Sequence, residues 1–71
     1  MGRTRAPEYV VERIDQVVGR VGYSKSSIYN FIAEGTFPQP IKLGSRSVGW
    51  LSHEIDEWIL ERIEKRDQGH E

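Results

Sequence analysis

The Gly22-Tyr23 junction constrains the fold of this chain most strongly, because it separates two short helical patterns by only two residues. Before it, apolar side chains recur at the i, i+3, i+4 and i+7 positions of one helical face, at Ile14, Val17, Val18 and Val21. After it, Ser24 is a good N-cap, and Gly35 suits the left-handed position that ends a helix. Two short helices joined by a glycine-containing turn form a helix-turn-helix, whose second helix can enter the major groove of DNA.

The second predicted helix, residues 24–34, has a core side and a polar side. Ile28, Phe31 and Ile32 share the core side, whereas the opposite side carries Lys25, Ser26, Tyr29, Asn30 and Ala33. We expect Lys25 to contact phosphate at the groove edge, with hydroxyls added by Ser26 and Ser27; the alternative is an ordinary solvated surface.

Two residues of this helix have more specific possible roles. The amide of Asn30 can pair with N6 and N7 of adenine, although an exposed polar residue without a role is the competing interpretation. The ring of Tyr29 can pack on the edge of the core while its hydroxyl reaches a phosphate.

A β-hairpin is predicted after this helix. Pro38 and Pro40 favour an extended chain, and two short strands follow at residues 41–43 and 48–50, joined by Gly44-Ser45-Arg46-Ser47. One interpretation is a solvated hairpin tip. The other is a wing, 44–47, in which Ser45 and Arg46 reach the DNA backbone or minor groove with assistance from Lys42.

The ends of the chain complete the predicted elements. A short strand is expected at residues 9–11, and a last helix from about His53 to Lys65, capped by Ser52, with an apolar stripe of Ile55, Trp58, Ile59 and Ile63. Both tryptophans, Trp50 and Trp58, are interpreted as core. Leu60 lies about 140° from Ile55 around that helix, so it is either a single exposed leucine or a dimer contact. Residues 1–8 are expected to be a flexible basic arm and residues 67–71 a disordered tail.

Charge is unevenly distributed, although the formal net charge is only −1. Residues 1–50 carry seven basic and four acidic side chains, and residues 51–71 carry three basic and seven acidic ones. Because salt screens charges beyond about 10 Å, a basic face can bind phosphate while an acidic face stays in solvent.

Several classes of protein are disfavoured by composition. The chain has no cysteine, and its two histidines, His53 and His70, lack metal-cluster spacing, so no metal or cofactor is expected. The acidic run of the last helix has no nucleophile or metal partner beside it, which argues against an enzyme. No apolar run is long enough to span a membrane and no signal peptide is recognisable, so we expect a cytoplasmic, nucleoid-associated protein.

Together these elements predict a mainly α fold with a small β-hairpin, a winged helix-turn-helix domain over residues 9–66. The run GYSKSSIYNFIAEGTFPQPIKLGSRSVGW, continuing into LSHEIDEWI, resembles the AlpA family of phage and prophage regulators, which is related to MerR-type and excisionase DNA-binding domains. The resemblance covers roughly residues 10–66. Its most specific parts are the serine-rich helix start, the Ile-Tyr pair and the EG-x-FP-x-P ending, followed by KLGSRSVGW and EIDEW.

The resemblance implies a sequence-specific, DNA-binding transcription regulator of a phage or mobile element, with residues 24–34 as recognition helix and Arg46 on the wing. Members often carry a basic residue where this chain has Asn30, so this helix is less cationic. Two alternatives stay open: an excisionase-like protein that bends DNA for a recombinase, and a small adaptor whose acidic helix binds a protein. Double-stranded DNA is the expected partner, and a homodimer, a side-by-side oligomer and contacts with a recombinase or RNA polymerase are left open.

Overall fold

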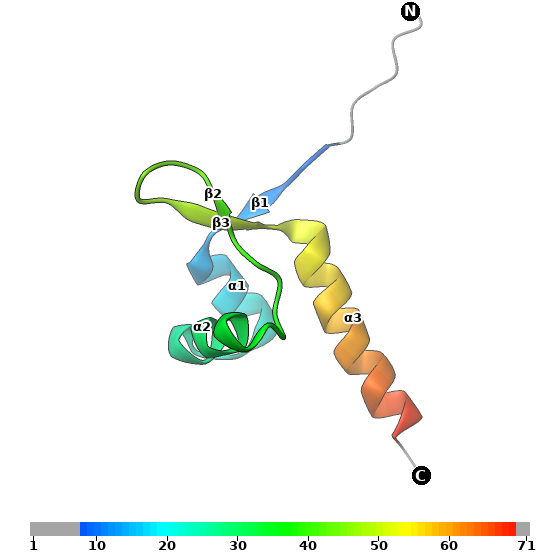
Figure 1. Cartoon of the computed structure of the whole chain (residues 1–71). Helices are drawn as coiled ribbons and strands as arrows, with labels where there is room; N and C mark the ends of the chain where they lie inside the picture. The colour runs from blue at the N-terminus through cyan, green and yellow to red at the C-terminus, as the bar shows by residue number, and fades with distance from the viewer. Residues whose placement is uncertain (1–7, 70–71) are drawn as a thin grey trace, which may run out of the picture.

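The computed structural model describes residues 8–69, in which a small sheet lies over two short helices and a long helix leaves from one end (Figure 1). In chain order, the elements are β1 (Val11–Glu12), α1 (Ile14–Val21), α2 (Lys25–Glu34), β2 (Ile41–Lys42), β3 (Val48–Leu51) and α3 (Ser52–Gln68). The predicted mainly helical fold with a wing-like hairpin is confirmed. The basic arm proposed for residues 1–8 lies, apart from Glu8, outside the described residues.

The two short helices end where the glycines predicted. Gly22 and Gly35 follow α1 and α2 with φ angles of 79° and 81°, a region that side chains other than glycine rarely adopt. At the start of α2, the hydroxyl of Ser24 accepts a hydrogen bond from the backbone N–H of Ser27 at 3.2 Å. The turn between α1 and α2 is therefore fixed at both of its ends.

The sheet has the strand order β1-β3-β2, and both pairings are antiparallel. The hairpin of β2 and β3 pairs Ile41 with Gly49 and Lys42 with Val48, and the backbone N–H of Leu43 donates to the carbonyl of Ser47 at 2.8 Å. The first strand differs from the expected residues 9–11: it covers Val11 and Glu12, because these residues face Leu51 and Trp50 of β3.

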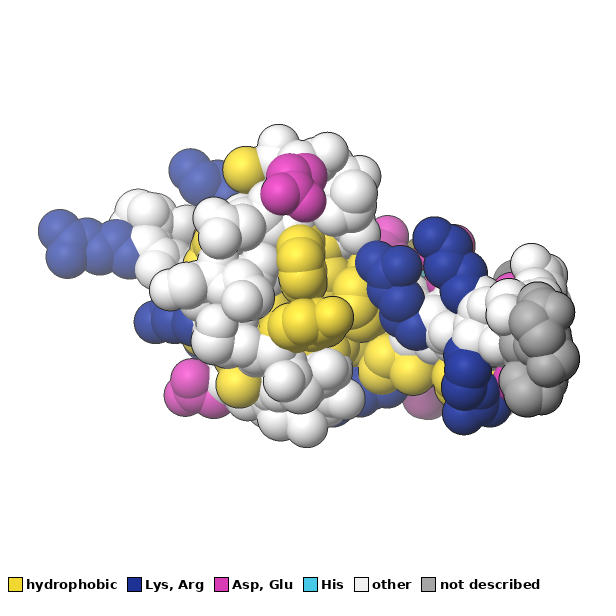
Figure 2. Space-filling model, turned by 90° about the horizontal axis from the view of Figure 1, so that it is seen from below, with side chains coloured by type: hydrophobic (Ala, Val, Ile, Leu, Met, Phe, Trp, Pro, Cys, Tyr) yellow, Lys and Arg dark blue, Asp and Glu magenta, His cyan; other side chains and the backbone are white. Residues whose placement is uncertain are grey.

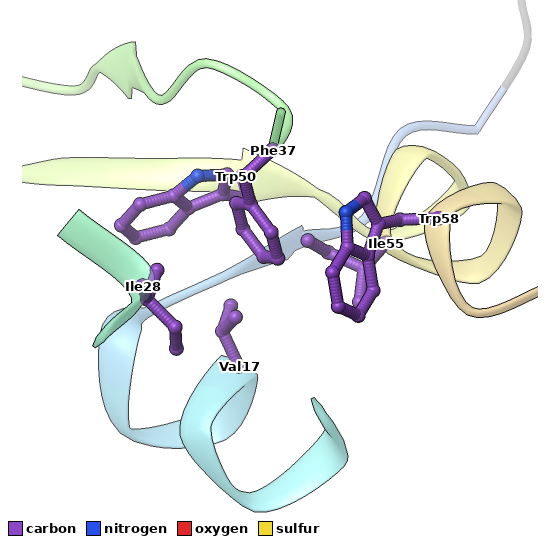
Figure 3. Packing of buried hydrophobic residues seen from close by; sticks show 6 residues of the cluster. All are labelled: Val17, Ile28, Phe37, Trp50, Ile55 and Trp58. Carbon is purple, nitrogen blue, oxygen red and sulfur yellow. The ribbon is translucent and has the colours of Figure 1, made fainter. Parts of the chain in front are cut away.

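The core lies between the sheet and the helices, and every helix contributes to it (Figure 3). Its buried side chains are Val17, Ile28, Phe37, Trp50, Ile55 and Trp58. Both tryptophans are core residues, as predicted, and their indole N–H groups are paired: Trp50 donates to the carbonyl of Pro38 at 3.0 Å, and Trp58 to that of Thr36 at 2.9 Å. These two bonds hold the extended segment before the wing against β3 and α3.

A polar network joins β1, α1 and α3. Glu12 is only 7% exposed, and its carboxylate accepts hydrogen bonds from Arg20 and from the hydroxyl of Ser52, the latter at 2.7 Å. Arg20 also donates to Asp56 of α3. The prediction that Ser52 caps α3 is wrong: Leu51 occupies the N-cap position without a side-chain bond, and the Ser52 hydroxyl is directed to Glu12 instead.

Helix α3 is longer than predicted and extends beyond the core. It begins at Ser52 and continues to Gln68, so Asp67 and Gln68 are helical and do not belong to a tail. Ile63, expected in the buried stripe, is 41% exposed, because this part of α3 has no neighbouring element to pack against. Within residues 8–69 no helix is long and apolar enough to cross a bilayer.

Candidate nucleic-acid interface

The face of α2 that points away from the core is polar and exposed. Lys25, Ser26, Tyr29 and Asn30 all lie on it, whereas Ile28 on the opposite side is fully buried. Ala33, also exposed, stands among them and adds little bulk. The burial of Ile28 therefore fixes which side of α2 can approach a groove.

The start of α2 is electrically positive. Its first turn contains no acidic side chain and begins with Lys25, whereas the first turns of α1 and α3 contain Asp15 and Glu54. Free backbone N–H groups and the helix dipole add positive potential at this end. Ser27 is half-buried, and its hydroxyl accepts a hydrogen bond from Ser24 at 3.1 Å, so it is less available to a ligand than Ser26.

Tyr29 combines a packed ring with an exposed edge. The centroids of the Tyr29 and Trp50 rings are 6.3 Å apart, and the two ring planes form an angle of 62°. Tyr29 is 41% exposed. Contact with a buried tryptophan restricts the ring and directs the rest of the side chain outward. This geometry matches the dual role expected from the sequence, although the contact with phosphate stays a prediction.

The wing lies on the same side of the molecule as α2, and α3 lies on the other (Figure 1). Lys42 is paired with Val48, which packs against the core, so both belong to the sheet face that covers the helices. Ser45 and Arg46 are exposed at the tip. From below, basic side chains project at the end of the molecule that carries the wing (Figure 2).

The basic side chains of the N-terminal part fall into two groups. Arg20 is held by Asp56 and Glu12, and its hydrogen bonds with Asp56 first and Glu12 second raise the pKa of its guanidinium. Within residues 8–69, in contrast, no ion pair involves Arg13, Lys25, Lys42 or Arg46. These four cations are therefore available to an anionic partner, whereas Arg20 is committed to the fold; three of the four, Lys25, Lys42 and Arg46, lie on α2 and the wing hairpin.

An open hollow of the described chain lies elsewhere. It encloses about 750 Å³ and separates the extended segment 35–41 from α3. Its charged lining comes from α3 and is mixed: the carboxylates of Glu54, Glu57 and Glu61 and the cations of Arg62 and Lys65. No exposed residue of α2 or of the wing tip lines it, so this hollow is separate from the candidate DNA surface.

The network of Glu12, Arg20 and Asp56 was missed by sequence reasoning. Arg20 lies eight residues after Glu12 but 36 before Asp56, and no local pattern separates Arg20 from the other basic residues. Arg20 is one of the seven basic side chains of residues 1–50, and its salt bridges show that this count includes a structural cation. Glu12 lies directly after the strand predicted at residues 9–11, and only the structure shows that it belongs to β1 and pairs with the buried Trp50.

A helix-turn-helix followed by a two-stranded wing defines a winged helix-turn-helix protein. Comparison with known families agrees: the family described as "Prophage CP4-57 regulatory protein (AlpA)" matches residues 11–63. The chain therefore belongs to the AlpA family.

Two relatives illustrate the similarity. The chain is 37% identical to "Uncharacterized protein ORF88" of Enterobacteria phage P4, in a match that covers 83% of this chain and 67% of the relative. It is 36% identical to "DNA-binding transcriptional activator AlpA" of Escherichia coli (strain K12), over 70% of this chain and 80% of the relative. The family match itself, residues 11–63, extends through α2 and the wing into α3.

Proposed function

We propose that the protein is a sequence-specific DNA-binding transcription regulator that inserts α2 into the major groove and rests its wing on the backbone or minor groove. The observation that carries this proposal is the separation of charge: Lys25, Lys42 and Arg46 are unpaired within residues 8–69 and flank the polar face of α2, while Arg20 is neutralised. A relative whose name describes a DNA-binding transcriptional activator supports it.

Each contact has a distinct task in this proposal. Lys25 and Arg46 neutralise phosphates on either side of the groove, and Lys42, Ser26 and Ser45 add contacts to the backbone. Asn30 reads a base edge from the exposed face of α2, most effectively an adenine. Tyr29, held by Trp50, donates its hydroxyl to a phosphate. Ser27 contributes mainly by closing the cap with Ser24.

The acidic helix α3 does not oppose this mode of binding. Its C-terminal part leaves the domain on the side opposite the wing (Figure 1), so its carboxylates are screened from DNA held at α2. Family membership and the lack of a catalytic constellation on this surface argue against an enzymatic role.

Binding of the whole chain to genomic fragments, followed by sequencing of the retained DNA, tests the proposal. The logarithm of the binding constant should fall linearly with the logarithm of salt concentration, with a slope of about −0.9 for each phosphate neutralised. Affinity that is insensitive to salt, or absence of any retained fragment, would contradict DNA binding and favour the adaptor alternative. Circular-permutation gel mobility separates the remaining two possibilities, because a strongly bent complex indicates the excisionase-like alternative.

A further inference from the structure

The C-terminal half of α3 is exposed along its whole described length. All residues from 60 to 69 are solvent-accessible, and the helix projects away from the sheet and from α1 and α2 (Figure 1). A helical segment of this length has only marginal stability in water when no other element packs against it. Contact with another surface would therefore stabilise this half of α3.

An apolar ridge leads from the edge of the core into this projecting half. Ile59 is half-buried and packs against the core, whereas Leu60 is 50% exposed and Ile63 is 41% exposed. At about 100° per residue, these three side chains lie within an arc of about 100° on one side of the helix. We call them the α3 ridge. Leu60 is thus not a single exposed leucine, because Ile63 lies beside it.

Opposite charges flank the ridge symmetrically. Asp56 precedes Ile59 by three residues, and Arg66 follows Ile63 by three residues, so the pattern is centred on residue 61. Asp56 and Arg66 both lie within about 60° of Ile59 around the helix, on the ridge side. If a second α3 packs antiparallel about this centre, Ile59 faces Ile63 of the second copy, and Asp56 faces Arg66 of the second copy.

The surroundings of Asp56 favour an incoming cation. Asp56 and Glu12 share the single guanidinium of Arg20, so this group of three side chains carries one excess negative charge. Asp56 is exposed, its side chain being 59% accessible, and can accept a further ion pair. Arg66, at the other end of the ridge, has only its neighbour Asp67 as an ion-pair partner within residues 8–69.

We propose that the α3 ridge is a homodimer interface, in which two copies of α3 pack antiparallel about a two-fold axis at residue 61. The contact is self-complementary, as a two-fold interface requires. We expect the dimer to be weak, because each copy contributes only two exposed apolar side chains and one ion pair. The surface area that these groups bury is below that of a standard protein–protein interface. A two-fold dimer would present its two α2 helices to an inverted repeat. The dimer itself does not depend on DNA binding, so it can be tested without DNA.

The competing apolar surface is the outer face of the sheet, where Ile41 and Leu43 are exposed. It lacks a symmetric pair of opposite charges, but it supplies a matched control. Leu43 is 46% exposed, comparable with the residues of the α3 ridge. Leu43→Glu therefore puts a carboxylate in place of an exposed apolar side chain, as Ile63→Glu does on the α3 ridge, but on the outer face of the sheet.

Sedimentation equilibrium of the whole chain, measured without DNA over increasing protein concentration, tests the proposal. We expect a monomer–dimer equilibrium, a roughly tenfold or greater increase in the dimer Kd for Ile63→Glu, and little change for Leu43→Glu. A chain that stays monomeric up to about 1 mM overturns the dimer, as does dissociation caused by Leu43→Glu but not by Ile63→Glu. Circular dichroism at low concentration checks that Ile63→Glu keeps its helix.

A charge reversal makes the test independent of the apolar substitution. Arg66→Glu places a carboxylate opposite Asp56 of the second copy, so it should raise the dimer Kd roughly threefold or more at low salt and less at high salt. Lys65→Glu changes the net charge equally and lies on the opposite side of α3, so its Kd should match that of the wild type. Equal effects of the two substitutions would overturn the antiparallel arrangement.

Discussion

Two regions of this molecule use arginine in opposite ways. At the junction of β1, α1 and α3, Arg20 donates to the buried Glu12 and to Asp56, and its charge is neutralised inside the domain. On the wing, Arg46 is exposed at the tip and no ion pair holds it within residues 8–69. The first arginine links α1 to β1 and α3, and the second is available to an anionic partner, which we propose is DNA. Counting basic residues therefore misjudges a binding surface unless each partner is known.

The same comparison makes a net charge of −1 compatible with the proposed binding to DNA. Its acidic residues are concentrated on α3, away from the wing, and one of its basic residues is used by the fold. On the opposite side lie Lys25, Lys42 and Arg46, and no side chain of residues 8–69 forms an ion pair with them. A phosphate responds to the electrostatic potential of the surface it approaches. The distribution of charged residues therefore matters more here than the net charge of the chain.

Arg20→Ala should have the largest effect and would break the junction. Glu12 is buried, and its Oε1 has no hydrogen-bond partner within residues 8–69, so loss of Arg20 leaves the carboxylate with the hydroxyl of Ser52. Removing one partner of a buried ion pair typically costs 3–5 kcal/mol; because Arg20 itself is partly exposed, we expect about 2–3 kcal/mol. Urea unfolding measures the loss. Arg13→Ala, at an exposed arginine nearby, is the control, and equal losses would show that the network contributes nothing specific.

Asn30→Ala should have the next largest effect, on binding and not on stability. Loss of a bidentate contact to adenine should weaken binding to the cognate site by about 1–3 kcal/mol and relax preference at one base pair, with the salt slope nearly unchanged. Competition binding with single-base variants of the site measures this. Gln68→Ala removes a similar amide at the far end of α3 and should bind as the wild type does. Unchanged selectivity in Asn30→Ala would remove this residue from the proposed reading surface.

Arg46→Ala should have the smallest effect and would sharpen the contrast with Arg20. It should leave the free energy of unfolding unchanged, weaken binding to cognate and scrambled duplexes alike, and reduce the salt slope by about 0.9. Fluorescence anisotropy at several salt concentrations measures both quantities. Lys65→Ala, which removes one charge from α3, is the control. Wild-type affinity of Arg46→Ala at every salt concentration would mean that the wing is structural only.

Much of the fold could be predicted because its signals are local. The apolar spacing of α1, the Ser24 cap and the glycines after α1 and α2 act within a few residues of where they stand, and all three are confirmed. The candidate contacts of α2 and the wing could be proposed for the same reason. Whether Lys25, Asn30 and Arg46 touch DNA stays a prediction, because no local signal distinguishes a contact from a solvated side chain.

The sequence by itself determined the helix-turn-helix and the wing, since helix periodicity, capping and tight turns depend on neighbours in the chain. Only the tertiary structure decided that Ser52 donates to Glu12 and does not cap α3, that Arg20 is a structural residue, and that Ile63 is exposed. Each of these outcomes depends on residues distant in sequence: β1 must pair with β3 before Glu12 meets Ser52, and α3 must dock before its C-terminal half is left without a neighbour. Burial and ion pairing are properties of the packed chain, so they cannot be assigned until the packing is known.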